Sequence, residues 1–203
     1  MTRRRSRYRS ITSLQRDNRV CRACTDEGFP LESLPVVQPF RGQRALVFGQ
    51  APGIVEGEER RPWRGRAGRT LRRWLELEED EFYATFYCAS VTRCFPGPSP
   101  SGRGDRRATP VEEALCTPWR EDELRLLRPA LVVTIGLAAA RQLLGVRRLT
   151  DAIGKSYVLD DAIAIPLPHP SGASGWLNDE RNRRRLGKAL THVRRELERF
   201  ATA

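Results

Sequence analysis

Two polar residues, Gln50 and Glu56, follow a short apolar run at a point where the chain turns. Residues 45–48 read Ala-Leu-Val-Phe, and a Gly-Gln-Ala-Pro-Gly loop follows at once at 49–53. The run predicts a buried strand, and its glycines and proline predict a tight turn where the backbone can approach a ligand closely. Ligands bind outside the carboxyl ends of the strands in open α/β sheets, so this loop is a candidate site.

Cys21 and Cys24 form a second candidate site, a Cys-x-x-Cys pair. A turn with this spacing places two thiols on one side of a loop, and both metal sites and redox pairs use that geometry. A thioredoxin-like redox pair would open a helix after a strand, but no strand pattern precedes this pair. Metal binding is therefore the better interpretation, provided that other cysteines supply further ligands.

The charge of the chain indicates a polyanionic partner. Its 203 residues include 36 basic and 25 acidic side chains, a net charge of +11, and nucleic acid is the obvious partner for such an excess. The arginine bias, with Lys155 and Lys188 as the lysines, would also arise in a GC-rich genome. No run approaches the ~20 apolar residues of a membrane span, and no secretory signal is present. We therefore expect a cytoplasmic monomer with no membrane partner, nucleoid-associated if prokaryotic.

Apolar runs and helical spacings alternate along the chain. Strands are predicted at 45–48, 84–92, 131–135 and 162–166. Helices are predicted at 67–77, from Pro110 after the N-cap Thr109, after the third strand to Leu144, and at 179–200. This order predicts an α/β fold, a three-layer αβα sandwich with a central, largely parallel four-stranded sheet.

Three further segments carry structural expectations. Residues 1–19 are expected to be a basic, flexible N-terminal arm, and the folded domain is expected at 20–203. Residues 95–108, rich in proline, glycine and serine, are expected to form a mobile loop. Pro118 is expected to break or restart the helix that begins at Pro110.

Several motifs occur in a specific order. They are Gly-Gln-Ala-Pro-Gly at 49–53, Arg-Pro-Trp-Arg-Gly-Arg-Ala-Gly at 61–68, Tyr-Cys-Ala-Ser-Val-Thr-Arg-Cys at 87–94 and His-Pro-Ser at 169–171. Together they resemble the uracil-DNA glycosylase superfamily, with the closest likeness to its iron–sulfur branch, family 4. The resemblance covers about residues 20–200. It implies a glycosylase domain that hydrolyses the N-glycosidic bond of a deaminated base, uracil by default, flipped out of single- or double-stranded DNA.

The resemblance also implies a [4Fe–4S] cluster, which makes 20–203 a domain with metal-cluster cysteines. The implied ligands are Cys21, Cys24, Cys94 and Cys116. Residue types and spacing alone leave zinc open as an alternative. The loop between the third and fourth of these cysteines is longer than is usual in the family. Cys88 stands outside the set and is expected to pack in the core.

The same resemblance assigns roles in a base-binding pocket. Trp63 would stack on the flipped base, and His169 would approach a carbonyl oxygen of uracil and stabilise the negative charge of the leaving base. Glu56 would orient or activate the attacking water and offset the positive charge that develops on the sugar. The glycines and the serine expected to bind the base or DNA phosphates through their loops are Gly49, Gly53, Ser171 and Gly172.

Three residues depart from the family pattern. Gln50 replaces a glutamate usual in this branch, and because an amide is a poor base we expect Glu56 to carry more of any proton transfer. Ser90 stands where the family commonly has an asparagine that reads the uracil edge. Trp176 lies in a segment that normally enters the DNA, either as a wedge or as a core anchor. These departures leave two alternatives: a glycosylase for hypoxanthine or xanthine, or a catalytically weak iron–sulfur DNA-binding protein on the same scaffold.

Overall fold

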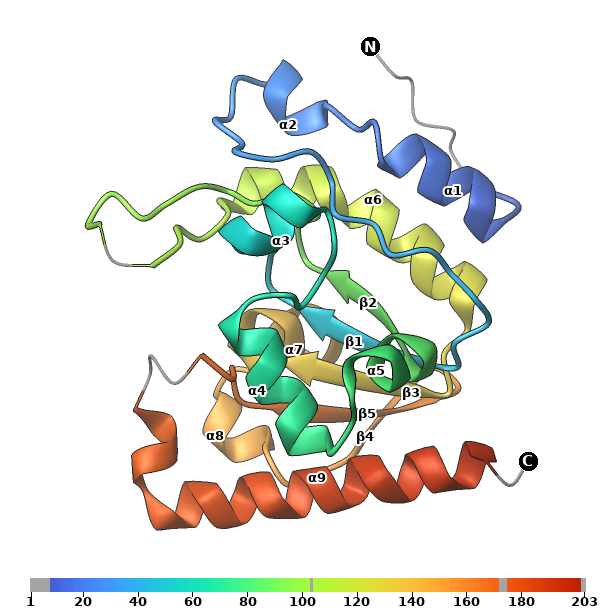
Figure 1. The fold of residues 1–203 in the computed structure, drawn as a ribbon, viewed down its shortest axis with the longest axis vertical. Helices are drawn as coiled ribbons and strands as arrows, with labels where there is room; N and C mark the ends of the chain where they lie inside the picture. Colours follow the sequence, from blue (N-terminus) through green and yellow to red (C-terminus); the bar gives the residue numbers. More distant parts are fainter. Residues whose placement is uncertain (1–7, 103, 172–174, 202–203) are drawn as a thin grey trace.

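A five-stranded sheet forms the centre of the molecule in the computed structural model, which describes residues 8–102, 104–171 and 175–201. The strands lie in the order β2-β1-β3-β5-β4 (Figure 1). Four of them run parallel, and β4 pairs antiparallel with β5 at the edge of the sheet. Their bounds are β1 Ala45–Gly49, β2 Phe86–Ser90, β3 Leu131–Ile135, β4 Tyr157–Leu159 and β5 Ala162–Leu167.

Helices cover both faces of the sheet, because successive strand residues point to opposite sides. Val47 faces a core that the sheet shares with helices α4, α5 and α9, whereas Leu46 and Phe48 face a second core shared with α6 and α7. The bounds of these helices are α4 Arg66–Leu75, α5 Glu79–Thr85, α6 Pro110–Leu127, α7 Gly136–Leu144 and α9 Glu180–Ala201. The predicted three-layer αβα sandwich with a largely parallel sheet is confirmed.

The sheet has one strand more than the four predicted. The additional strand, β4, is three residues long and is joined to β5 by a turn at Asp160, where φ is 50°. Val158 in its middle is 78% exposed, so this segment lacks the buried apolar run from which a strand can be predicted. It forms because β5 would otherwise present unpaired backbone groups at the edge.

Helix α6 begins as predicted but continues through its proline. Thr109 accepts a hydrogen bond from the backbone N–H of Glu112, and the Glu112 carboxylate accepts one from the N–H of Thr109, which completes a capping box. The break expected at Pro118 does not occur. A proline removes one backbone donor from a helix. The buried residues Cys116, Trp119 and Leu127 on either side of it keep the helix packed against its neighbours.

The segment expected as a flexible arm is described from Tyr8 onward. It contains α1 (Ile11–Asn18), whose N-cap Ser10 accepts from the N–H of Ser13. Tyr8 and Leu14 are buried against Trp119 of α6. The shorter helices are α2 Ala23–Asp26, α3 Ile54–Glu59, α8 Leu149–Ala152 and the 3-10 turn η1 Trp176–Asn178. No helix in the described ranges is long and apolar enough to cross a membrane.

Candidate active site

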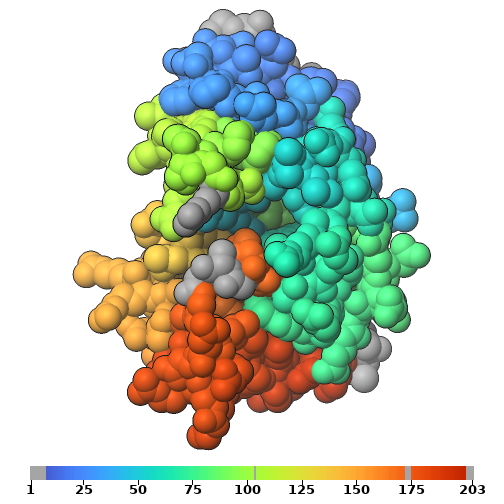
Figure 2. Space-filling view, turned by 60° about the vertical axis from the view of Figure 1, so that its left-hand side comes forward, coloured from blue at the N-terminus to red at the C-terminus, as the bar shows by residue number. Residues whose placement is uncertain are grey.

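A cavity of about 270 Å³ opens at the carboxyl ends of β1 and β2. Strand order reverses at β1, since β2 lies on one side of it and β3 on the other, and α/β proteins bind ligands at such switch points. Figure 2 shows the hollow between the segments near residues 50–65, 100–108 and 169–171. The polar and aromatic side chains that line it are Gln50, Glu56, Trp63, Arg66, Ser90, Asp105, His169 and Ser171.

Trp63 is held in a strained backbone conformation at the wall of this pocket. Its φ is 60°, a left-handed value that a bulky residue rarely adopts. Arg72 donates to its carbonyl oxygen at 2.9 Å, and Tyr83 donates to the carbonyl of Pro62 at 2.6 Å. A Cβ at Gly68 would lie 1.7 Å from the Trp63 oxygen, so only glycine fits there. Strain of this kind, fixed by several neighbours, is typical of functional sites.

The Trp63 indole lies against Gly49, the last residue of β1. A Cβ on Gly49 would lie 3.0 Å from Cζ2 of the indole, closer than most side chains tolerate. The ring of His169 approaches from the loop after β5, with its centroid 6.5 Å from that of Trp63 and the planes inclined at 38°. One aromatic face and one imidazole therefore meet in the same pocket.

The tautomer of His169 follows from its neighbours. The backbone N–H of Ser171 donates to Nδ1 at 3.3 Å, and the Ser171 hydroxyl lies 2.9 Å from the same nitrogen. Because Nδ1 accepts, the hydrogen of the neutral ring is on Nε2. His169 keeps contact with solvent at the open side of the pocket, yet partial burial of the ring lowers its pKa, and Glu56 opposes this shift.

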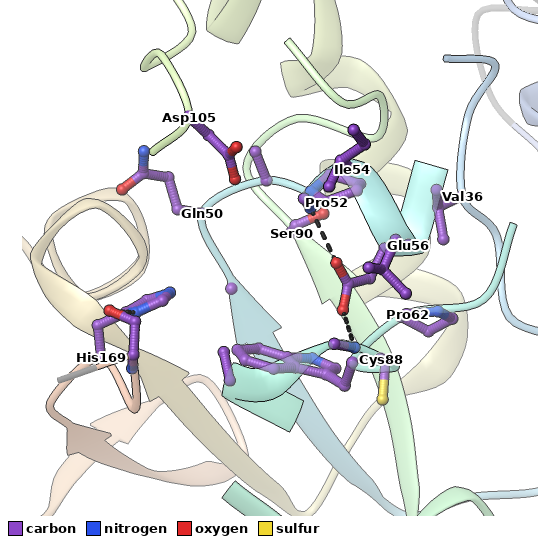
Figure 3. A pocket seen from close by; sticks show the side chains of 18 of the residues that line it. Val36, Gln50, Pro52, Ile54, Glu56, Pro62, Cys88, Ser90, Asp105 and His169 are labelled. Carbon is purple, nitrogen blue, oxygen red and sulfur yellow. Dashed lines mark hydrogen bonds between the residues drawn. The ribbon is translucent and has the colours of Figure 1, made fainter. Parts of the chain in front are cut away.

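Glu56 connects two loops of the site. Its Oε2 accepts from the N–H of Gly53 at 3.2 Å, and its Oε1 accepts from the N–H of Gly65 at 2.7 Å; Figure 3 shows both bonds. Each carboxylate oxygen is thus engaged by the backbone. Glu56 therefore stabilises the turn after β1 and adds a negative charge to the pocket.

Gln50 and Ser90 both line the pocket but differ in their side-chain hydrogen bonds within the described part of the chain. The Ser90 hydroxyl donates to the carbonyl oxygen of Thr92 at 2.7 Å, so its lone pairs remain for a ligand. Among the described residues, no partner binds the side-chain amide of Gln50, whose backbone oxygen accepts from Thr92. Gln50 can therefore turn its amide toward a ligand or a water.

Of the three residues expected to contact DNA, the structure describes two, and these two have different surroundings. Ser171 lies at the pocket beside His169, and Gly172 falls outside the described residues. Trp176 donates from Nε1 to the hydroxyl of Thr150 at 3.0 Å and packs against the main core. These contacts correspond to the core-anchor interpretation of Trp176.

The four cysteines with an expected ligand role surround one small cavity between α1, α2, α6 and the loop after β2. It is lined by Cys21, Cys24, Cys94 and Cys116 together with Asn18 and Arg93. Burial, together with the nearby Cys116 and Glu112, raises the pKa of Cys24 to about 12. Burial also raises the pKa of Cys94, and nearby Cys116 adds to the shift. Cys88 lies apart in β2, fully buried in the main core and at the floor of the active-site pocket.

The surroundings of these thiols fit an anionic metal group. Within the described ranges no three ligating side chains already stand in metal-binding geometry. Several buried polar atoms beside them nevertheless have no hydrogen-bond partner there: both amide atoms of Asn18, Nε of Arg93 and Nη1 of Arg120. Three of these atoms, Nδ2 of Asn18, Nε of Arg93 and Nη1 of Arg120, are donors. Buried donors without partners cost free energy, and a cluster of negative charge with sulfur acceptors would satisfy these three. The donor set therefore fits a four-thiolate centre.

Asp105 is the pocket residue that the sequence analysis missed. It comes from the long loop between Cys94 and Cys116, which composition marks as an ordinary polar loop. The unusual length of that loop was the available signal, because an insertion that follows a site strand can carry a site residue.

Fold and pocket together define an α/β protein with a candidate ligand pocket at the carboxyl edge of a largely parallel sheet. Residues 37–194 match the family described as "Uracil DNA glycosylase superfamily". The chain is similar to the type-4 uracil-DNA glycosylase of Sulfurisphaera tokodaii, with 25% identity over 179 residues, 81% of this chain and 76% of that protein. It is also similar to the type-4 uracil-DNA glycosylase of Pyrobaculum aerophilum, with 30% identity over 120 residues, 55% and 56% of the two chains.

This protein belongs to the uracil-DNA glycosylase superfamily. Its named relatives are of the type-4 branch, so the resemblance read from the ordered motifs is confirmed. Hydrolysis of a base from DNA is the activity of this class, and the pocket described above is its candidate active site.

Proposed function

We propose that this protein is a monofunctional glycosylase that removes uracil from DNA and leaves an abasic site. The meeting of Trp63 and His169 in one pocket, 6.5 Å between ring centroids, is the observation that carries the proposal. A flipped base needs a π-face to stack on and a donor for the charge that it takes away. Trp63 supplies the face, and the Nε2–H of His169 supplies the donor.

In this proposal Ser90 recognises the edge of the base through a hydrogen bond. Because its hydroxyl hydrogen is directed to Thr92, the oxygen offers lone pairs to the pocket. Uracil has an N3–H that such an acceptor can bind, whereas cytosine has a lone pair at N3 that it repels. Ser90 therefore supports rejection of cytosine with a single contact.

The same contact favours one alternative substrate class. Hypoxanthine and xanthine also carry an N–H beside a carbonyl, so a lone acceptor at Ser90 distinguishes them from uracil less well than a donor and an acceptor together. Excision of these deaminated purines is the second candidate function.

In this proposal the attacking water is bound on the side of the sugar opposite to the base. Gln50 orients the attacking water through its uncommitted amide, and Glu56 offsets the positive charge on the sugar. The loops around Gly49, Gly53 and Ser171 bring backbone groups to the base and the adjacent phosphates, and we extend the same role to Gly172. DNA is bound through the net charge of +11.

A [4Fe–4S] cluster held by Cys21, Cys24, Cys94 and Cys116 completes the proposed protein. When bound, such a cluster crosslinks α2, the loop after β2 and α6 through metal–thiolate bonds. The unpartnered atoms of Asn18 and Arg93 support this assignment, with zinc as the rival. We assign the cluster a scaffold role, because its cavity is separate from the pocket that holds His169.

Matched oligonucleotides carrying uracil, hypoxanthine, xanthine or no damaged base test the function. Under single-turnover conditions, alkaline cleavage reveals each abasic site. We expect excision from the uracil strand and none from the undamaged strand. Binding without excision of any base would identify a DNA-binding protein that has lost catalysis.

A further inference from the structure

A hairpin in the loop after β2 carries Asp105 into the active-site pocket. The N–H of Ser99 donates to the carbonyl of Gly104 at 2.8 Å, and the N–H of Arg106 donates to that of Gly97 at 3.0 Å. Asp105 itself forms a β-bridge with Pro98. The backbone of Asp105 is therefore fixed by paired neighbours on both sides.

The base of this hairpin is attached to α6. Arg106 donates from both terminal nitrogens to Glu112, at 2.7 and 2.8 Å, and Glu112 is 1% exposed. Thr109 holds the same carboxylate through its backbone N–H at 2.7 Å. A bidentate pair to a buried carboxylate fixes direction as well as distance. It orients the residue next to Asp105.

Asp105 meets the turn after β1 at Gly53. The position of a Cβ on Gly53 would be 3.3 Å from Oδ2 of Asp105 and 2.9 Å from Oε2 of Glu56. Figure 3 shows the Asp105 carboxylate directed from its loop toward the turn that carries Gln50 and Pro52. Both carboxylates thus reach one glycine of the pocket.

Among the described residues, one of these two carboxylates is held by backbone hydrogen bonds and the other is not. Glu56 accepts backbone hydrogen bonds at both oxygens. In the described part of the chain, no hydrogen bond or ion pair engages the carboxylate of Asp105, which lies at the solvent edge of the pocket. Gln50, which also lines the pocket, is an amide and cannot take a proton at neutral pH.

We propose that Asp105 is the general base of the hydrolysis and replaces a carboxylate that position 50 does not supply. This role rests on the proposed glycosylase function. The C1′–N1 bond breaks and its electron pair leaves with the base. A water oxygen then bonds to C1′, and its proton passes to Asp105, which returns it to solvent. Glu56 fixes the turn, and Gln50 orients the same water.

The charges in the pocket support the assignment of proton transfer to Asp105. Partial burial and the charge of Glu56 raise the pKa of Asp105 above its usual value. A higher pKa makes an ionised carboxylate a stronger proton acceptor. The other charged or titratable side chains that line the pocket are Glu56, Arg66, Cys88 and His169.

Single-turnover excision of uracil by Asp105→Asn tests the proposal. We expect the rate to fall about 100-fold or more, the usual size of a general-base contribution, with unchanged affinity for DNA that carries 2′-fluoro-deoxyuridine. The wild-type rate should rise with pH as Asp105 loses its proton, and this rise should vanish in the variant. Adding Gln50→Glu to Asp105→Asn should recover part of the rate, because position 50 then supplies a base.

Asp161→Asn is the matched control, since Asp161 is an exposed carboxylate in the turn before β5. It should keep the wild-type rate and pH profile. A wild-type rate and pH profile in Asp105→Asn would overturn the role of Asp105 alone. A wild-type protein that excises no base would overturn the glycosylase function and this role together.

Discussion

Gly49 and Trp63 are in such close contact that the indole would have to shift by a few tenths of an ångström to admit a side chain at position 49. A Cβ on Gly49 would lie 3.0 Å from Cζ2 of the indole. The end of β1 therefore sets the position of the ring on which we propose that the base stacks. Arg72 also fixes the backbone of Trp63 through its carbonyl oxygen, which limits how far the residue can move from β1.

Gly49→Ala is accordingly expected to slow base excision by about 10-fold, because small displacements of a positioning group cost orders of magnitude in rate. Gly187→Ala is the matched control. Gly187 lies exposed in α9 with open space around it, so alanine there should leave excision unchanged and stabilise the fold by about 0.5–1 kcal/mol. Equal rates for wild type and Gly49→Ala would show that the ring does not depend on this contact.

The cluster assignment predicts a brown protein with broad absorbance near ~400 nm. Cys94→Ala and Cys116→Ala should lose this absorbance together with iron and acid-labile sulfide. Cys88→Ala should retain it, because Cys88 lies in the main core and does not line the four-cysteine cavity. A colourless wild-type protein with one equivalent of zinc would contradict the iron–sulfur assignment.

The histidine titration has a predicted sign. Partial burial lowers the pKa of His169 below that of an unfolded chain, so the unfolded state binds the proton more readily. Stability that depends on His169 is therefore complete above about pH 6.5 and is lost as the pH falls below that value. The chain has two histidines, so His192→Gln leaves a single Cε1–H resonance to follow by NMR. A midpoint above 6.5 for His169 would contradict the lowered pKa that burial of the ring predicts.

The charge of the protein predicts a steep dependence of DNA affinity on salt. Neutralising phosphates releases counterions, so the logarithm of the association constant should fall linearly with the logarithm of salt concentration. Fluorescence anisotropy from 50 to 200 mM salt (order-of-magnitude range for such titrations) measures the slope. A flat response would indicate that the excess arginine reflects genome composition.

The elements of this fold that could be predicted from the sequence are those that short, local residue patterns specify. The buried runs of β1 and β3 and the capping box at Thr109 determine their elements without help from distant residues. Their order along the chain was enough to indicate that Gln50 and His169 follow strand ends. In contrast, β4 depends on a neighbouring edge, and α1 depends on packing of Leu14 against Trp119.

Asp105 shows why part of the site could not be predicted. Its place in the pocket results from the bridge to Pro98 and from the pairing of Arg106 with Glu112, both formed by the folded chain. No periodicity marks such a residue in a polar loop. The hydrogen bonds of both Glu56 oxygens to backbone N–H groups are equally invisible in the sequence, and our proposal that Asp105 takes the proton depends on them.

The most direct test compares wild type and His169→Ala in single-turnover excision of uracil and of 5-fluorouracil from the same oligonucleotide. We predict that the wild type excises both. The variant should lose about 10²–10³-fold on uracil, as expected when one donor to a developing anion is removed. It should lose less on 5-fluorouracil, whose anion needs less stabilisation. A wild type that excises neither base, or a variant as fast as wild type on uracil, would contradict this account.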